Sequence, residues 1–181
     1  MNRFLATISC LIFSFVAFAQ SYTPVDEGSK VHFTIKNFGV STGGDFSHLK
    51  GQISFDPNNP NASMFAVTVD VNTVDTDSET RDGHLKGENY FDAEKYPVIS
   101  LSSTKIAKAN NRGGSQFTGM LTMHGVSKEI SFPFTARLQG NDYLFSGEFE
   151  INRLDYAIGE SSAVLSKTMK VSLAVLARKV N

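Results

Sequence analysis

The chain has 181 residues, and its 17 Lys and Arg against 18 Asp and Glu leave a formal net charge of -1, which gives no electrostatic reason to expect a nucleic-acid partner. Its length fits one domain that can bury a core without covalent cross-links. The 15 Phe and five Tyr, with no Trp, supply a large apolar load for that core.

The N-terminus has the pattern of a secretory signal peptide. Arg3 precedes an apolar run over residues 4–18, and small residues ending at Ala19 form a cleavage site before Gln20. The run is too short to span a membrane, and no later segment approaches that length. We therefore expect a cleaved signal at 1–19 and a periplasmic or secreted product. Because Cys10 lies in the signal, the product has no cysteine, which excludes disulfides, thiolate catalysis and cysteine-ligated metals.

The rest of the chain, residues 20–181, is rich in strand patterns and is expected to form one domain. Apolar residues alternate with polar ones, and polar or glycine-containing breakers separate the alternating segments. Eight strands are predicted, at 31–38, 46–55, 64–74 and 98–106, as three strands within 115–152, and at 167–178.

Residues 75–97 interrupt this strand pattern. Thr76 or Ser78 can cap a short helix that runs through Leu85 and Lys86, and Gly87 can end it. Eight antiparallel strands with one helical excursion favour a closed or nearly closed barrel, because closure removes exposed sheet edges. A two-sheet sandwich is the competing architecture.

The segment 115–152 predicts three paired strands with a phenylalanine-rich face. Turns at Gly125-Val126 and Gly140-Asn141, each with glycine first, would set the register. The pairs expected from these turns are Leu121 with Ile130, Gly119 with Phe132, Phe117 with Phe134, Ala136 with Phe145, Phe134 with Gly147, and Phe132 with Phe149. From these strands alone, the phenylalanines are read first as ordinary core residues and second as the wall of a cavity.

Candidate catalytic and metal-binding residues give weak signals. None of the four histidines lies two or four residues from another, and His32 and His124 fall on the polar side of their strands, so no metal site is predicted. Arg81, Asp82 and His84 lie within one helical turn. We read Arg81 and Asp82 first as groups that satisfy loop amides and hold the helix over the barrel opening, and second as part of a catalytic site.

Arg153 is read similarly, first as the partner of Asp155 in an ion pair at the end of a strand and second as a polar contact for a ligand head group. No nucleophile elbow, phosphate loop or paired-acid motif is found in the chain, so no catalytic residue is assigned.

Three blocks of the chain resemble the YceI-like family of secreted, lipocalin-like barrels that bind polyisoprenoid lipids. They are the Arg81-Asp82-Gly83-His84-Leu85 run with the Tyr90-Phe91-Asp92 and Lys95-Tyr96-Pro97 motifs that follow it, then residues 117–128, and then residues 151–159. The likeness spans nearly the whole chain after the signal. Where family members often carry a His-Ser pair and a second histidine on the first long strand, this chain has Gly28-Ser29 and Asn37, so no role of those histidines is carried over.

The resemblance implies an all-β, eight-stranded antiparallel barrel with a short helix near one opening, which holds an isoprenoid (polyprenyl or quinone-like) chain or a similar amphiphile without a cofactor. The polar mouth is assigned to Arg81, Asp82, His84 and Arg153. The apolar ligand-binding positions are assigned to Phe33, Ile35, Phe46, Phe55, Val67, Val69, Phe117, Leu121, Phe132, Phe134, Phe145, Phe149, Val171 and Leu173.

Two other functions stay open at this point: a ligand-free envelope stress or interaction module, and a hydrolase or isomerase that uses Asp82 and His84. The oligomeric state, a homodimer included, is also open.

Overall fold

The computed structural model describes residues 19–109 and 114–180. The predicted signal peptide, with Cys10, lies outside the described residues except for Ala19. Within the two described ranges, no helix is long and apolar enough to cross a bilayer.

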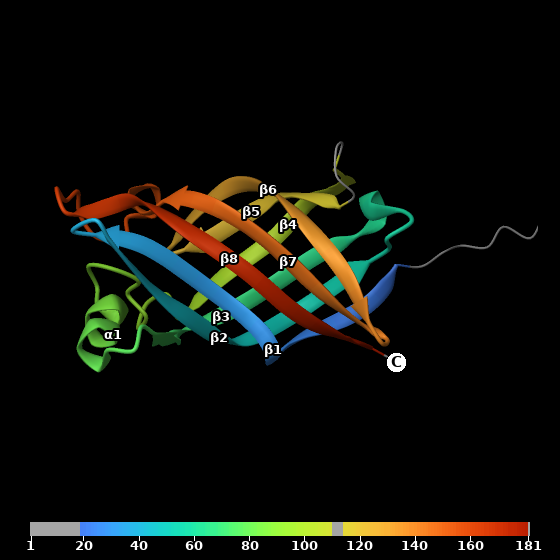
Figure 1. The fold of residues 1–181 in the computed structure, drawn as a ribbon, viewed down its shortest axis with the longest axis horizontal. Helices are drawn as coiled ribbons and strands as arrows, with labels where there is room; N and C mark the ends of the chain where they lie inside the picture. Colours follow the sequence, from blue (N-terminus) through green and yellow to red (C-terminus); the bar gives the residue numbers. More distant parts are fainter. Residues whose placement is uncertain (1–18, 110–113, 181) are drawn as a thin grey trace, which may run out of the picture.

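Eight antiparallel strands close into a barrel in which each strand pairs with its neighbours in the chain and β8 pairs with β1 (Figure 1). The barrel prediction is confirmed, and the two-sheet sandwich is excluded. The strands are β1 (Gln20–Asn37), β2 (Val40–Phe55), β3 (Met64–Asp75), β4 (Val98–Lys108), β5 (Ser115–Met123), β6 (Val126–Gln139), β7 (Asp142–Asn152) and β8 (Leu165–Lys179), with short 3-10 helices at Pro60–Ala62 and Arg153–Tyr156.

The first strand begins much earlier than residue 31, where the sequence placed it. Its pairing with β8 is interrupted between Val25 and Lys30, where Gly28 has a φ of 78°. Ser29 closes the gap, since its hydroxyl donates to the Val25 carbonyl at 2.5 Å and accepts from the Leu176 amide at 2.8 Å. This irregularity breaks the alternation of period two, and pattern reading therefore missed the first part of the strand.

The single α-helix is confirmed within the predicted segment. Helix α1 (Glu79–Lys86) starts after Ser78, whose side chain accepts from the Arg81 amide, and it ends at Gly87, whose amide donates to the His84 carbonyl. Ser78 is therefore the cap, rather than Thr76. Figure 1 shows α1 at one end of the barrel, beside the β1–β2 turn.

The β5–β6 turn is one residue earlier than predicted, and the register of this pair was therefore wrong. His124 and Gly125 are the two central residues, with φ of 50° and 73°, a type I′ turn. The observed partners are Gly119 with Ile130, Phe117 with Phe132, and Leu121 with Lys128, two residues away from the predicted ones. A shift of two keeps every side chain on its face of the sheet, so the predicted inward face survives.

The β6–β7 register is confirmed. Gln139 pairs with Asp142 around Gly140, whose φ is 64°, and Ala136 faces Phe145 while Phe134 faces Gly147. The rings of Phe132 and Phe149 stack with their centroids 4.7 Å apart.

Inward-facing side chains form two hydrophobic clusters along the barrel. One cluster, near α1, includes Phe33, Phe46, Phe91 and Tyr156. The other cluster, toward the opposite end, is built mainly from Tyr22, Phe55, Phe65, Phe117, Phe132, Phe134 and Phe145.

Candidate functional site

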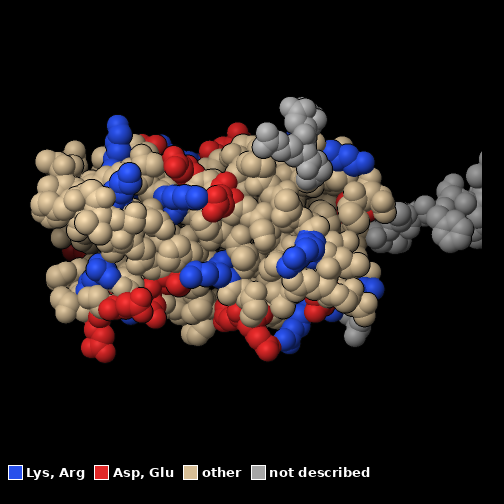
Figure 2. Space-filling model, in the orientation of Figure 1, with Lys and Arg blue, Asp and Glu red and all other residues tan. Residues whose placement is uncertain are grey.

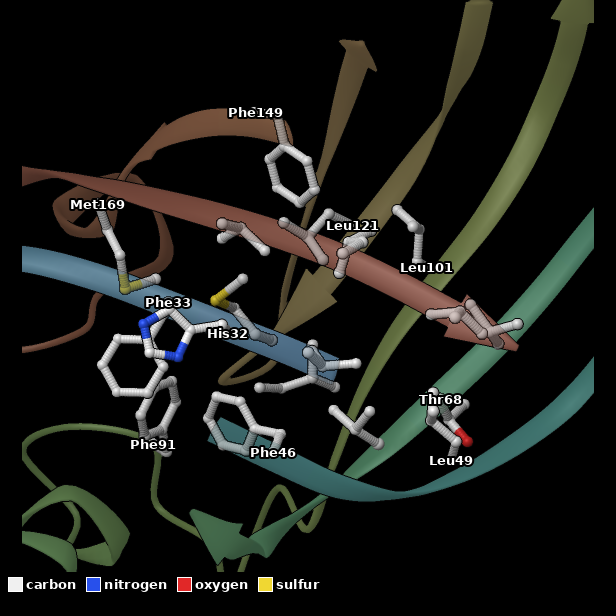
Figure 3. A pocket seen from close by; sticks show the side chains of 18 residues that line it. His32, Phe33, Phe46, Leu49, Thr68, Phe91, Leu101, Leu121, Phe149 and Met169 are labelled. Carbon is white, nitrogen blue, oxygen red and sulfur yellow. The ribbon is translucent and has the colours of Figure 1, made fainter. Parts of the chain in front are cut away.

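A cavity lies inside the barrel, lined mainly by side chains of the cluster near α1, and is called the central cavity below (Figure 3). Its volume is about 90 Å³, against about 10–15 Å³ needed for one water molecule. Phe33, Phe46 and Phe91 close its end toward α1, with ring centroids 5.5–5.6 Å apart in successive pairs. Apart from His32 and Thr68 its lining is apolar, with Val31, Leu49, Val67, Val69, Ile99, Leu101, Leu121, Met123, Phe149, Met169, Val171, Leu173 and Val175 completing the wall.

Two further cavities continue the central one in both directions along the barrel. A smaller cavity of about 50 Å³ on the far side shares Val67, Leu101, Leu173 and Val175 with the central cavity. A larger one of about 240 Å³ on the α1 side shares Phe33, Phe91 and Met169 with it. Because neighbouring cavities share lining side chains, the three follow one another along the barrel, and they are together called the channel below.

The accessibility of the inner wall also shows that the barrel is hollow. Leu101, Phe149, Val171 and Leu173 point inward by strand alternation and pack on the hydrophobic clusters, yet each is only half-buried. The paired strands close the barrel on every side, so these side chains are accessible from the interior space. An apolar void of this kind is unfavourable for water and forfeits packing contacts, which an apolar ligand can restore.

The cavity on the α1 side is the one with a polar lining. Asn37, Thr42, Thr76, Arg81 and His84 lie around it, opposite apolar residues of β8 and of the segment after α1. The channel is therefore apolar inside and polar at the α1 end, which is the arrangement that suits an amphiphile with a long tail.

Thr76 organises the polar groups at this end. Asp82 accepts from its amide at 3.0 Å and from its hydroxyl at 2.5 Å. The Arg81 Nε donates to the same hydroxyl at 2.8 Å, and a second Arg81 nitrogen donates to the Thr76 carbonyl. Arg81 and Asp82 thus tie α1 to the residue that follows β3, where Asp82 satisfies a backbone amide as predicted and Arg81 instead donates to a hydroxyl and a carbonyl.

The geometry does not assemble the catalytic pair that was considered. Within the described residues Asp82 is bonded to Thr76, and no hydrogen bond joins it to His84. A general base needs a partner that orients its imidazole toward a substrate, and His84 has no such carboxylate here. His84 instead lines the polar mouth beside Arg81.

Arg153 does not pair with Asp155, so the predicted ion pair was wrong. Arg153 is 2% exposed, and its guanidinium donates to the carbonyls of Ile158 and Glu160 at 2.7 Å each and of Ser166 at 3.0 Å. Burial lowers the pKa of Arg153 from its ordinary value. Arg153 lines none of the three cavities, and it holds the β7–β8 loop together rather than contacting the channel.

The histidines are dispersed. His32 pairs with Asp45 at 2.7 Å, His48 with Asp70 at 3.7 Å, and His124 bonds to the Tyr156 carbonyl at 3.2 Å from a turn rather than from the strand where it was placed. Among the residues in the two described ranges, no three His, Cys, Asp or Glu side chains gather as a metal site.

All of the predicted apolar positions except Phe55 line one of the three cavities. Phe55 packs instead against Phe65, Tyr143 and Phe145 in the far cluster. Some lining residues on strands, such as Met169 and Val175, were not predicted. They lie an even number of positions from predicted residues of the same strand, so alternation could have identified them. Phe91 follows α1 in an irregular segment, where no periodicity marks a residue as inward-facing.

Comparison with known proteins gives a consistent family. A family model described as YceI-like domain matches residues 22–177. A UPF0312 protein from Pseudomonas paraeruginosa is 32% identical over 180 residues, covering 94% of this chain and 93% of the relative. Similar proteins from Yersinia are 35% identical over 129 residues, and the chain spans 66% of their length, just under two thirds.

Solved structures share the barrel. BcnA of Burkholderia cenocepacia has a TM-score of 0.77 at 26% identity, with 82% of this chain and 95% of BcnA covered. A domain of Saccharophagus degradans, described as a polyisoprenoid binding domain implicated in plant cell wall breakdown, has a TM-score of 0.68 at 20% identity, with 91% of this chain and all of that domain covered. At that identity the second likeness shows the fold alone.

Proposed function

The chain belongs to the YceI-like family, and from this membership we propose that it is an exported carrier that holds an isoprenoid chain, or a similar amphiphile, inside its barrel. The observation that carries the proposal is the hollow apolar interior of a barrel that is otherwise closed. The polyisoprenoid-binding description of the Saccharophagus domain supports the choice of ligand class. Export rests on the predicted signal peptide at 1–19. Cleavage after Ala19 would give a product that begins at Gln20, which a measurement of its intact mass checks.

The energetics favour a flexible, branched hydrocarbon chain. Each buried methylene-sized group contributes about 0.8 kcal/mol, so a few prenyl units offset the cost of immobilising the ligand. Methionine side chains at Met123 and Met169 line the central cavity and can adapt to an irregular chain. Binding needs no covalent step.

The polar mouth supplies orientation. Arg81 and His84 at the α1 end offer hydrogen-bond donors to an oxygen-bearing head group, whereas the far cavity has Ser146 as its one hydroxyl. We therefore place the tail in the central and far cavities and the head group between α1 and the β1–β2 hairpin.

The test is binding of a fluorescent polyprenol to protein from which lipid has been removed by organic extraction. Val171→Phe places a ring in the central cavity and should weaken binding about ten-fold or more, because the ring occupies space that the tail needs. Ser172→Phe is the matched control, since the same ring on the next residue of β8 points out of the barrel.

Saturable binding by the wild type and by Ser172→Phe, with weak binding by Val171→Phe, supports the carrier. If the wild type binds no polyprenol and carries no lipid when isolated, the ligand-free interaction module takes its place.

A further inference from the structure

Phe38 at the tip of the β1–β2 hairpin is the most exposed large apolar side chain of the described residues, at 76%. Phe38 and Gly39 have φ of 50° and 77°, so they form a type I′ turn with a bulky aromatic in a left-handed conformation. Asn or Asp is preferred at that position, and a bulky residue there is a conformational outlier. With so little of its ring in contact, Phe38 gains nothing in the folded chain that would offset this cost.

Phe38 belongs to a contiguous apolar lip made of Phe38, Val40 and Val164. The amide of Phe38 donates to the Val164 carbonyl at 2.9 Å, and Val40 pairs with Asn37 across the hairpin. Val40 and Val164 are 66% and 41% exposed. Phe38 follows the end of β1, Val40 begins β2 and Val164 precedes β8. These three strands are neighbours in the barrel.

The apolar lip continues the wall of the polar-mouthed cavity. Asn37, Thr42 and Leu165 line that cavity, and each lies within two residues of a residue of the lip. The other exposed large apolar residues are dispersed, since Met64 and Val98 start the antiparallel strands β3 and β4 at opposite ends, Leu138 lies on β6 and Val180 follows β8.

Two exposed basic side chains lie close to the lip along the chain. They are Lys36 and Lys167, and within the described residues neither forms an ion pair, while of the two acidic residues between β7 and β8 Asp155 lies near Lys128 at 4.0 Å and Glu160 is exposed. Figure 2 shows this end of the molecule as mostly uncharged surface, with basic side chains above and below it and acidic ones gathered lower down.

We propose that the apolar lip docks onto an anionic lipid bilayer, with Phe38 inserted at the interface and Lys36 and Lys167 beside the head groups. Aromatic side chains favour this interface, and basic residues close to the surface add attraction to anionic lipids. Docking in this orientation brings the channel mouth to the membrane. Docking is a separate activity from ligand binding, and it would serve any lipid that enters at this mouth.

The absence of tryptophan from the chain gives a direct probe. Phe38→Trp places a single tryptophan in the lip, and Leu138→Trp places one at the opposite end, where Leu138 is 58% exposed. With vesicles of phosphatidylcholine mixed with phosphatidylglycerol, emission of the lip reporter should shift to shorter wavelength, and emission of the control should stay unchanged. Added salt, or phosphatidylcholine alone, should reduce the shift.

Phe38→Asn tests the same proposal through vesicle binding and thermal stability together. It should weaken vesicle binding in flotation about ten-fold, because the buried aromatic surface is lost, and raise the melting temperature, because Asn-Gly suits the turn. Leu138→Asn should leave vesicle binding unchanged.

An unchanged emission of Phe38→Trp with every vesicle overturns the docking, as expected if the lip contacts a protein partner. An equal emission shift with vesicles that contain phosphatidylglycerol and with vesicles of phosphatidylcholine alone overturns the role of Lys36 and Lys167. Polyprenol binding in vesicle-free solution, measured on the same proteins, separates the two proposals. A wild type that binds vesicles but no polyprenol would contradict the carrier function and leave the membrane docking intact.

Discussion

At the scale of single residues, Arg153 shows how a buried charge is held without a carboxylate. Its guanidinium donates to four backbone carbonyls between Ile158 and Ser166, so the β7–β8 loop wraps around one side chain. Carbonyl oxygens carry partial negative charge, and a planar fork with five donors can reach several of them at once. The loop borders the polar mouth, and Arg153 therefore contributes to the site by fixing the backbone of its rim.

Arg153→Met should lower the free energy of unfolding by about 2–4 kcal/mol, because it leaves one buried and three partly buried carbonyls without this donor while nearly keeping the volume. Urea denaturation followed by circular dichroism measures the change. Arg137→Met, an exposed arginine on the outer face of β6, is the control and should change stability by less than about 0.5 kcal/mol. Equal urea midpoints for the two variants would contradict the structural role of Arg153.

At the scale of elements, the β5–β6 hairpin shows what sets a register. Gly125 has a φ of 73°, and a Cβ built there would approach the Tyr96 ring at 2.7 Å. The same ring packs edge-on against His124 with centroids 5.3 Å apart. The turn is therefore held both by its own backbone conformation and by the segment after α1 that packs on it.

Gly125→Ala should destabilise the protein more than Gly140→Ala does. Both glycines are left-handed turn residues, but a Cβ at Gly140 has nothing within 4 Å. Gly140→Ala should cost about 1–2 kcal/mol from backbone strain alone.

The extra loss of stability at Gly125 comes from the clash with Tyr96, so Tyr96→Ala in the Gly125→Ala background should remove part of that loss. Thermal unfolding of the wild type, of Gly125→Ala, of Tyr96→Ala and of the double variant measures this coupling. Additive effects of the two substitutions would show that Tyr96 does not hold the turn.

At the scale of the whole molecule, the interior is packed in some places and hollow in others. Gly147 lines the far cavity, yet a Cβ there would lie 2.9 Å from the Phe132 ring, which already occupies the nearest space. Val171 lines the central cavity. The barrel therefore combines a rigid aromatic end with a central space that a ligand can fill.

Gly147→Leu should overpack the far end and lower the free energy of unfolding by about 1–3 kcal/mol. Val171→Phe, which fills a void, should leave stability within about 1 kcal/mol of the wild type while it blocks ligand. Thermal melting of both variants without lipid tests the contrast. A larger loss for Val171→Phe than for Gly147→Leu would mean that the central cavity is already filled by side chains.

The sequence by itself determined the features that depend on local chemistry. Alternation of period two identified eight strands and their inward faces, and the capping pattern around Ser78 and Gly87 located α1. These signals are local because a strand repeats every two residues and a helix end is satisfied by its own neighbours. The three sequence blocks that resemble the YceI-like family named the fold correctly.

Tertiary structure decided what depends on residues far apart in the chain. The dipeptides His124-Gly125 and Gly125-Val126 both suit a turn, and packing against Tyr96 accompanies the one that formed. Arg153 donates to carbonyls of a folded loop instead of pairing with nearby Asp155, and Phe55 packs in the far cluster instead of lining a cavity. Alternation assigns a side chain to a face, but only the closed barrel determines whether that face meets another side chain or empty space.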